Sequence, residues 1–186
     1  MNETLQVISN RRSTRAYQAE QITDSELQQI LDAALLAPSA LNFQKWHFTV
    51  VQNKDMLDRI VITIAEHMKK SGIEALVKRA GNPEYHTFHH APTVIIVSGD
   101  EESRYTQNDC SAAAQNILIA AESLNIGSCW IGSVRQLFTT EKADEFKKEL
   151  GIPEGYVVVC ALTLGYKVAD NDPAPVRNKN VINYIR

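Results

Sequence analysis

The sequence predicts one globular domain that mixes helices and strands. Apolar residues recur alternately at helical spacing and in short β-rich runs, and this alternation, taken by itself, favours a parallel α/β sheet. The chain has 186 residues, of which 44% are apolar, enough for a core without disulfides or structural metals. It contains no repeat, low-complexity tract or linker, so residues 1–186 are expected to form a single domain.

The N-terminal part of the chain predicts two helices separated by a basic run. Residues 3–10 place apolar side chains on one side of a two-turn helix. Thr23 and Glu26 match a capping box, and apolar residues then recur at helical spacing until Pro38 interrupts the pattern. The second helix is therefore expected to begin at Thr23 and to end before Pro38.

The middle of the chain alternates between the two kinds of element. Residues 47–51 have the composition of a strand, and residues 54–70 return to helical spacing. A weaker, charged helical stretch covers residues 72–82, and the apolar run at residues 93–97 indicates a fully buried strand. Because residues 104–124 are rich in alanine and apolar on most sides, they are expected to form the central, buried helix.

Shorter elements are expected towards the C-terminus. Gly127 is a candidate stop for the central helix, and residues 128–134 indicate a short strand. Residues 140–150 are amphipathic at helical spacing, and residues 156–164 form a continuous β-rich run. We therefore expect a strand, a helix and a further strand in that order.

The end of the chain is expected to be an extended tail over residues 166–186. Pro173 and Pro175 stand there among several Asp and Asn residues, a composition typical of irregular backbone. Residues 181–185 alternate like a strand, although no hairpin partner precedes them. This terminal strand is a candidate for pairing with a second subunit.

Charge and composition exclude several function classes. The formal net charge is −3, which lacks the positive field that nucleic-acid-binding proteins use, so any bound anion needs a local cluster of donors. No stretch reaches the roughly 18 apolar residues of a membrane span, and no secretion signal stands at the start. The three cysteines are widely spaced, as in a reduced protein. We expect a cytoplasmic protein with no nucleic-acid or membrane partner.

Three segments carry polar groups suited to a ligand. The run RRSTR at residues 11–15 offers guanidinium groups and a hydroxyl that can hold a phosphate, or it forms a solvated basic loop. The segment PSALNFQKW at residues 38–46 has amides that can read a heteroaromatic ring edge, or that serve turns. The segment CWIGS at residues 129–133 has a glycine that permits close backbone approach to a ligand, or marks a bulge.

These segments together resemble the nitroreductase superfamily of flavoproteins. RRSTRAY is similar to the family pattern RRSxRxF/Y, PSALNFQKW to PSAxNxQPW, and AAAQNILIAAESLNIGSCWIG to AxQNxLLAAxxLGLGxxWxG. GIPEGYVVVCALTLGY is similar to GIPxGYxxxxxxxxGY, so four motifs stand in the family's order along the whole chain. The departure is Lys45, where the family pattern has proline.

The resemblance implies a cofactor and residues that bind it. Arg11, Ser13 and Arg177 would contact an FMN phosphate, Arg15 would lie nearer the flavin pyrimidine edge, and the backbone of Gly132 would lie near N5. The segment at residues 38–44 would approach the flavin, often from the opposite subunit. The implied FMN-binding residues are Arg11, Arg12, Ser13, Arg15, Pro38, Ser39, Ala40, Asn42, Gln44, Ile131, Gly132, Ser133 and Arg177.

The resemblance also implies a fold and an activity. It implies an α+β, nitroreductase-like fold with helices around a mainly antiparallel sheet, in an intertwined homodimer with FMN at the interface. The implied activity is a ping-pong oxidoreduction in which NADH or NADPH reduces FMN, and a nitro compound, quinone or related small-molecule acceptor reoxidises it. No catalytic side chain is then required, because the flavin performs the electron chemistry. The alternatives are another flavin reaction of the superfamily, namely dehydrogenation, dehalogenation or flavin destruction, or a non-catalytic flavin-binding protein.

The histidine-rich stretch offers a metal-site alternative. His86, His89 and His90 stand together, with His67 as a possible fourth ligand, but H-x-x-H-H is not a recognised ligand motif. Tyr85 and Phe88 nearby indicate a packed loop instead. We therefore expect no metal site.

Overall fold

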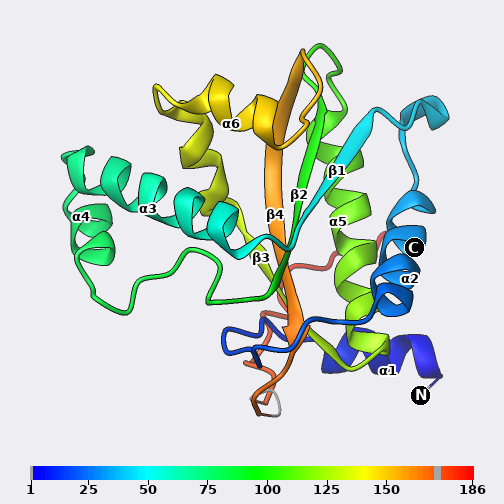
Figure 1. The fold of residues 1–186 in the computed structure, drawn as a ribbon. Coiled ribbons are helices and arrows are strands. Elements are labelled where there is room, and N and C mark those ends of the chain that lie inside the picture. Colours follow the sequence, from blue (N-terminus) through cyan, green and yellow to red (C-terminus); the bar gives the residue numbers. More distant parts are fainter. Residues whose placement is uncertain (1, 170–172) are drawn as a thin grey trace.

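The computed structural model describes residues 2–169 and 173–186 and has an α+β architecture (Figure 1). Within these residues four strands form a sheet in the order β1-β2-β4-β3, and every neighbouring pair is antiparallel. The antiparallel sheet implied by the family resemblance is confirmed, whereas the parallel sheet favoured by strand–helix alternation alone is wrong. The strands are β1 (Trp46–Val51), β2 (Thr93–Asp100), β3 (Ile126–Ile131) and β4 (Tyr156–Tyr166).

The helices surround this sheet and largely follow the expected boundaries. The predicted capping box is present: the Thr23 side chain accepts from the Glu26 backbone, and the Glu26 side chain accepts from the Thr23 backbone. The helices are α1 (Glu3–Asn10), α2 (Asp24–Leu35), α3 (Lys54–Lys70), α4 (Glu74–Ala80), α5 (Thr106–Ser123) and α6 (Ala143–Glu149), with 3₁₀ turns η1 (Ala40–Asn42) and η2 (Gly132–Thr139).

The connections explain why alternation does not produce a parallel sheet. Between β1 and β2 the chain makes two helices, α3 and α4, which contact each other and return it to the end of the sheet where β1 finished. Val51 at the end of β1 therefore lies opposite Val94 at the start of β2. The single helix α5 does cross from β2 to β3, but β4 lies between these two strands and runs antiparallel to both.

The core lies on both faces of the sheet, and β2 supplies side chains to each. Val94 and Ile96 pack with α3, α6 and η2 on one face, while Ile95 and Val97 pack with α2 and α5 on the other. Seven of the eight residues of β2 are buried, as expected of a central strand. Figure 1 shows α3 and α6 to one side of the sheet and α2 and α5 to the other. The predicted buried position of α5 is confirmed.

Two predicted boundaries are wrong. The strand expected over residues 128–134 is β3, which ends at Ile131, and Gly132 begins a 3₁₀ turn instead of interrupting a strand. The stop of α5 is Asn125, whose φ of 58° is left-handed, and not Gly127, which lies inside β3. Asparagine adopts this conformation more readily than most residues, which explains why the helix ends there.

The C-terminal tail begins later than predicted, and its described residues contain no strand. β4 continues to Tyr166, and Lys167 still bridges Tyr17. Residues 170–172 of the predicted tail lie outside the described residues. Residues 173–186 are exposed throughout, and the strand expected at residues 181–185 is absent because no neighbouring strand of the described chain lies beside it. Among the described helices, none has both the length and the apolar character to cross a bilayer.

Candidate functional site

The basic run at residues 11–15 is attached to one end of the sheet, where β3 begins and β4 ends. We call this the arginine end. Ser13 bridges Ser128 of β3, and the Thr14 backbone N donates to the Ser128 carbonyl at 2.9 Å. The Tyr17 hydroxyl lies 2.7 Å from both the Thr14 carbonyl and the hydroxyl of Thr163 on β4. The backbone of the run is therefore fixed by the sheet.

The guanidinium groups of this run have no carboxylate partner among the residues that the structure describes. Arg12 Nη1 donates to the carbonyls of Ser9 and Arg11 at 2.8 and 2.6 Å, and Arg15 Nη1 lies 3.5 Å from the Ser13 carbonyl. Within the described residues, none of the arginines at the arginine end forms an ion pair with Asp or Glu, and the buried Arg12 Nε has no hydrogen-bond partner. Unpaired cationic donors of this kind are the groups that hold a phosphate.

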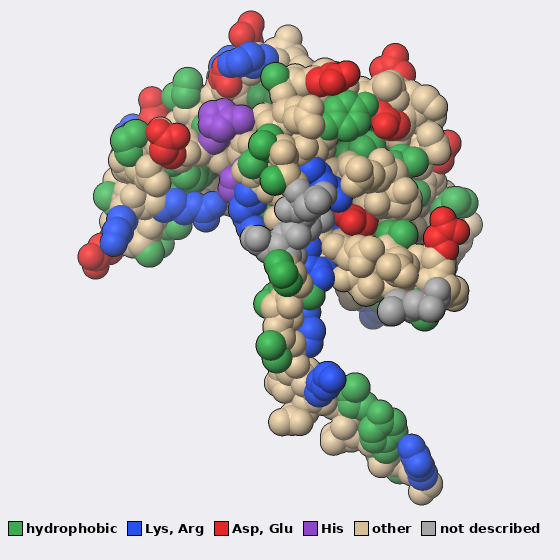
Figure 2. All heavy atoms as spheres, turned by 90° about the horizontal axis from the view of Figure 1, so that it is seen from below, with side chains coloured by type: hydrophobic (Ala, Val, Ile, Leu, Met, Phe, Trp, Pro, Cys, Tyr) green, Lys and Arg blue, Asp and Glu red, His purple; other side chains and the backbone are tan. Residues whose placement is uncertain are grey.

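A cavity of about 740 Å³ brings the basic run and the tail together. Arg177 comes from the exposed C-terminal segment 173–186, which projects from the body as an arm (Figure 2). Basic side chains gather on the surface where the arm leaves the body (Figure 2). The cavity is lined by Arg11, Arg12, Ser13, Thr14, Arg15, Ala16, Ala169, Pro173, Pro175 and Arg177.

The predicted segment at residues 38–44 lies elsewhere. It forms the loop around η1 next to the start of β1 and the end of β2, which we call the loop end of the sheet, opposite the arginine end (Figure 1). Pro38, Asn42 and Gln44 are exposed, and Ser39 and Ala40 are half-buried. Within one chain, therefore, the structure does not bring this segment into the cavity at the arginine end.

The third predicted segment lies at the end of β3. Ile131 is buried, Ser133 is half-buried and Gly132 is exposed. A Cβ added at Gly132 would meet no atom within 4 Å, whereas one added at Gly127 would meet the Thr14 side chain at 2.8 Å. Gly132 thus leaves open space beside the strand, while Gly127 permits close packing of the basic run.

Burial and the arginines act together on neighbouring titratable groups. Burial raises the pKa of the Cys129 thiol, and the positive charges of Arg15 and Arg11 oppose that rise. Burial also raises the pKa of the Tyr17 hydroxyl above its usual range. The pKa of His89 is lowered, first by burial and then by Arg15. The arginines of this end therefore act electrostatically on the neighbouring Cys129 and His89.

The histidine-rich stretch forms a packed loop. His86 Nδ1 accepts from the backbone N of Phe88 and of His90 at 3.2 and 3.1 Å, and the rings of His86 and His90 lie 3.9 Å apart. Burial lowers the pKa of His86 to about 4, so the ring is neutral near pH 7. In the part of the chain that the structure describes, no three His, Cys, Asp or Glu side chains are grouped to hold a metal.

Several contributors were not apparent in the sequence. Thr14 and Tyr17 hold the basic run to the sheet, but the sequence does not reveal their partners on β3 and β4. Asp109 belongs to none of the three polar segments, yet its Oδ1 accepts from the backbone N of Ala40 at 3.1 Å. Asp100 binds Lys45 across 55 positions of sequence. Such long-range partners leave no local pattern that a reading of periodicity could detect.

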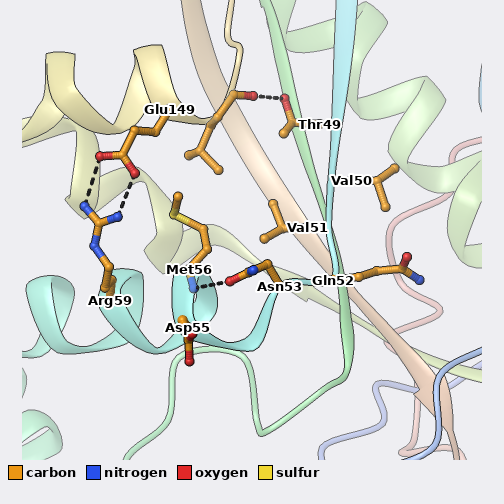
Figure 3. Close-up of a pocket in the computed structure, with 10 residues that line it drawn as sticks. Thr49, Val50, Val51, Gln52, Asn53, Asp55, Met56, Arg59 and Glu149 are labelled. Atoms are coloured by element: carbon orange, nitrogen blue, oxygen red, sulfur yellow. Dashed lines mark hydrogen bonds and ion pairs between the residues drawn. The ribbon is translucent and has the colours of Figure 1, made fainter.

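A second cavity, of about 600 Å³, lies between β1, α3 and the end of α6, away from the predicted residues (Figure 3). Arg59 donates to both carboxylate oxygens of Glu149 there, at 2.6 and 3.1 Å, and Thr49 donates to the Leu150 carbonyl. The charged donor of this cavity is thus already paired, in contrast to those of the arginine end.

The model of one known protein family matches most of the chain. The model of the Nitroreductase family matches residues 8–166, a range that includes the basic run, the η1 loop and all four strands. The chain belongs to the nitroreductase family. It is a nitroreductase-family oxidoreductase.

Relatives in this nitroreductase family support the assignment at the level of sequence and fold. A protein of Archaeoglobus fulgidus, provisionally named NADH dehydrogenase/NAD(P)H nitroreductase, is 38% identical over 177 residues, covering 92% of this chain and 90% of that one. A nitroreductase from Bacteroides fragilis, crystallised with bound FMN, is 34% identical with a TM-score of 0.93, and each chain is covered completely. One from Desulfitobacterium hafniense, also with bound FMN, is 34% identical with a TM-score of 0.90, again over both whole chains.

Proposed function

We propose that this nitroreductase-family chain binds FMN and passes electrons from NADH or NADPH to a nitro compound, a quinone or a related small-molecule acceptor by a ping-pong mechanism. The observation that carries the proposal is the cavity at the arginine end, where Arg11, Arg12, Ser13 and Arg15 face Arg177 and where no carboxylate stands among the lining residues that the structure describes. Structures of relatives at 34% identity contain FMN, and the names of other relatives give NAD(P)H as donor.

The residues present fit a flavin phosphate. Three planar guanidinium groups and a hydroxyl within five residues can form several charge-assisted hydrogen bonds to one dianion, and the buried Arg12 Nε lacks a partner. Arg11, Ser13 and Arg177 are proposed to hold the phosphate. Gly132, which has open space beside it, is proposed to let a planar ring approach the backbone of β3.

The side chains act by binding and by electrostatics. Bound FMN supplies the two-electron chemistry that side chains do not provide. Arg15 is exposed and charged beside the cavity, so it can stabilise negative charge on the pyrimidine edge of the ring. The Tyr17 and Thr163 hydroxyls hold the backbone of the run in place, which keeps the guanidinium groups preorganised for this charge.

We further propose that the site is completed by a second copy of the chain. Pro38, Ser39, Ala40, Asn42 and Gln44 lie at the loop end, too far along the sheet to reach the arginine end of the same chain (Figure 1). A homodimer would place the loop of one subunit against the arginine end of the other. The exposed apolar side chains of the arm, including Val176, Ile182 and Ile185, are consistent with burial against a partner.

Flavin content and anaerobic reduction test the activity. The purified protein should be yellow, release FMN on denaturation, and bleach when NADH or NADPH is added without oxygen. Reoxidation by a nitro compound or quinone over many turnovers supports the proposal. Bound FMN without turnover would instead indicate a non-catalytic flavin-binding protein, and reduction only by another donor would indicate a different flavin reaction.

Replacement of Gly132 tests the placement of the ring. Gly132→Ala should leave the unfolding of the apoprotein unchanged, because its Cβ meets no atom within 4 Å, but should weaken FMN binding by steric conflict. Unchanged FMN affinity would place the ring elsewhere. Isothermal titration of the apoprotein measures this affinity directly.

Subunit complementation tests the composite site. One chain carries Arg11→Ala and Arg177→Ala, the other carries Asn42→Ala and Gln44→Ala, and the two bear different tags. If each site combines the arginine end of one subunit with the loop of the other, the heterodimer keeps one intact site and binds FMN, whereas neither homodimer does. If each site lies within one subunit, the heterodimer binds none. A monomer that binds FMN would refute the dimer.

A further inference from the structure

The loop that carries Asn42 and Gln44 has an unfavourable backbone. Leu41, Asn42 and Gln44 have φ of 49°, 56° and 53°, in the left-handed region that is unfavourable for residues other than glycine. Packing does not offset this cost, because Leu41 and Phe43 are 82% and 58% exposed. The conformation is therefore held by hydrogen bonds, some inside the loop and others from neighbouring elements of the fold.

Asp109 at the start of α5 holds the first part of the loop. It is only 8% exposed, and its Oδ1 accepts from the backbone N of Ala40 at 3.1 Å. Within the loop, Ser39 Oγ accepts from the backbone N of Gln44 at 3.1 Å. These two bonds fix where the loop leaves α2 and how tightly it turns.

Asp100 at the end of β2 holds the last part of the loop. Its Oδ2 lies 2.5 Å from Lys45 Nζ, and its backbone N donates to the Lys45 carbonyl at 3.1 Å. Its other oxygen accepts from the backbone N of Glu102 at 3.0 Å, and its carbonyl accepts from the Thr106 hydroxyl. The carboxylate is thus oriented by β2 and α5, and the Lys45 ammonium binds to a group already in place.

We propose that Lys45 and Asp100 are positioning residues, which together with Asp109 hold the loop so that it presents Asn42 and Gln44 to the flavin. The family pattern has proline at position 45, and a proline ring restricts the backbone covalently. In this chain an ion pair and a backbone hydrogen bond restrict the same residue from outside. The inference rests on the proposed FMN function.

The test removes the ion pair and compares two flavins. Lys45→Met and Asp100→Asn should each weaken binding of FMN and of riboflavin by the same factor, about two- to fivefold for a partly exposed pair. Riboflavin lacks the phosphate, so an equal loss places the effect at the ring and not at the arginines. Because both changes break one interaction, the double variant should bind no more weakly than either single variant.

The controls separate positioning from general stability. Lys54→Met removes a Lys–Asp pair of the same 2.5 Å length on α3, away from the loop, and should leave flavin affinity as in the wild type. Lys45→Arg should restore binding to within about twofold, since it keeps the charge. The flavin midpoint potential should fall in Lys45→Met and not in Lys54→Met, because loosened loop donors stabilise the reduced ring less.

The outcomes are distinguishable. If the wild-type protein binds no FMN, the proposed function fails and this inference fails with it. If the wild type binds FMN but Lys45→Met matches Lys54→Met in affinity and potential, only the inference is overturned. A loss of affinity with an unchanged potential, or a loss for FMN alone, also overturns it.

Discussion

The two ends of the sheet hold their candidate ligand-binding segments in different ways. At the arginine end, the run pairs with β3 through Ser13 and Thr14, and its backbone has no left-handed residue. At the loop end, three left-handed residues depend on the carboxylates of Asp100 and Asp109. In the first arrangement the described cationic donors have no carboxylate partner and can bind an anion. In the second, the charged side chains bind one another or the backbone and so hold the loop. The comparison teaches that charged side chains remain available to a ligand where pairing with the sheet, and not an ion pair, fixes the backbone that carries them.

The largest expected effect is at the arginine end. The double change Arg11→Ala and Arg177→Ala should weaken FMN binding roughly 100-fold or more, since each hydrogen bond to a charged group contributes about 1.5–3 kcal/mol. Riboflavin binding should change little because it has no phosphate. Titration calorimetry with both flavins measures the difference. Arg104→Ala, at the loop end, is the matched control and should behave as the wild type; equal FMN affinity in the double variant would mean that the run is a solvated basic loop.

Two glycines allow each end to be disturbed separately. A Cβ at Gly127 would lie 2.8 Å from Thr14, and one at Gly99 would lie 2.7 Å from Cys110 Sγ and 3.0 Å from the Lys45 carbonyl. Each alanine variant should lose about 1–3 kcal/mol of unfolding free energy by overpacking. Urea unfolding of the apoprotein measures this loss.

The same two variants should differ in flavin binding. Gly127→Ala shifts the arginine run, so it should weaken the binding of FMN more than that of riboflavin. Gly99→Ala shifts the loop and should weaken the binding of both flavins equally. If the two variants lost FMN affinity and riboflavin affinity in the same proportion, the division of roles between the ends would be contradicted. Gly132→Ala, which meets no atom within 4 Å, provides the baseline for unfolding of the apoprotein.

A smaller, pH-dependent effect is expected in the histidine loop. The pKa of His86 is lowered to about 4 by burial, against about 6.5 in an unfolded chain, so the unfolded state binds more protons between these values. The contribution of His86 to the free energy of unfolding is complete above pH 6.5, falls as the pH decreases, and is lost below about pH 4. His86→Asn keeps an acceptor in place of Nδ1. In this variant the free energy of unfolding, measured with urea, should fall less between pH 6.5 and pH 4. His47→Asn controls for loss of a histidine elsewhere; an unaltered decline in His86→Asn would show that other groups cause it.

The smallest effect concerns strain in the loop. Leu41→Gly should raise the unfolding free energy by about 0.5 kcal/mol, because relief of left-handed strain slightly exceeds the entropic cost of glycine. Leu36 is equally exposed, at 82%, but has an ordinary φ of −84°, so Leu36→Gly should give no gain. Thermal unfolding of both variants at one protein concentration makes the comparison. Equal changes in the two would mean that the loop stores no strain at Leu41.

The elements that could be predicted from the sequence are those encoded by neighbouring residues. The capping box of Thr23 and Glu26, the helix over residues 54–70 and the buried strand β2 all depend on periodicity or on contacts three or four positions apart. The strand direction could not be predicted in this way, because it depends on α4 returning the chain and on β4 lying between β2 and β3. Only the resemblance to a family supplied the antiparallel sheet.

In the candidate site, too, some properties follow from the sequence and others from the tertiary structure. The sequence by itself determined which groups are available: the guanidinium groups of residues 11–15, the amides of Asn42 and Gln44, and the open backbone of Gly132. The family resemblance implied that Arg177 joins the arginine run, and both line one cavity in the structure. Only the tertiary structure decided that the loop lies at the other end of the sheet and that Asp100 and Asp109 hold it. The physical reason is that residue chemistry is local, whereas the partners that orient a side chain are brought together only when the sheet and its helices bury a common core.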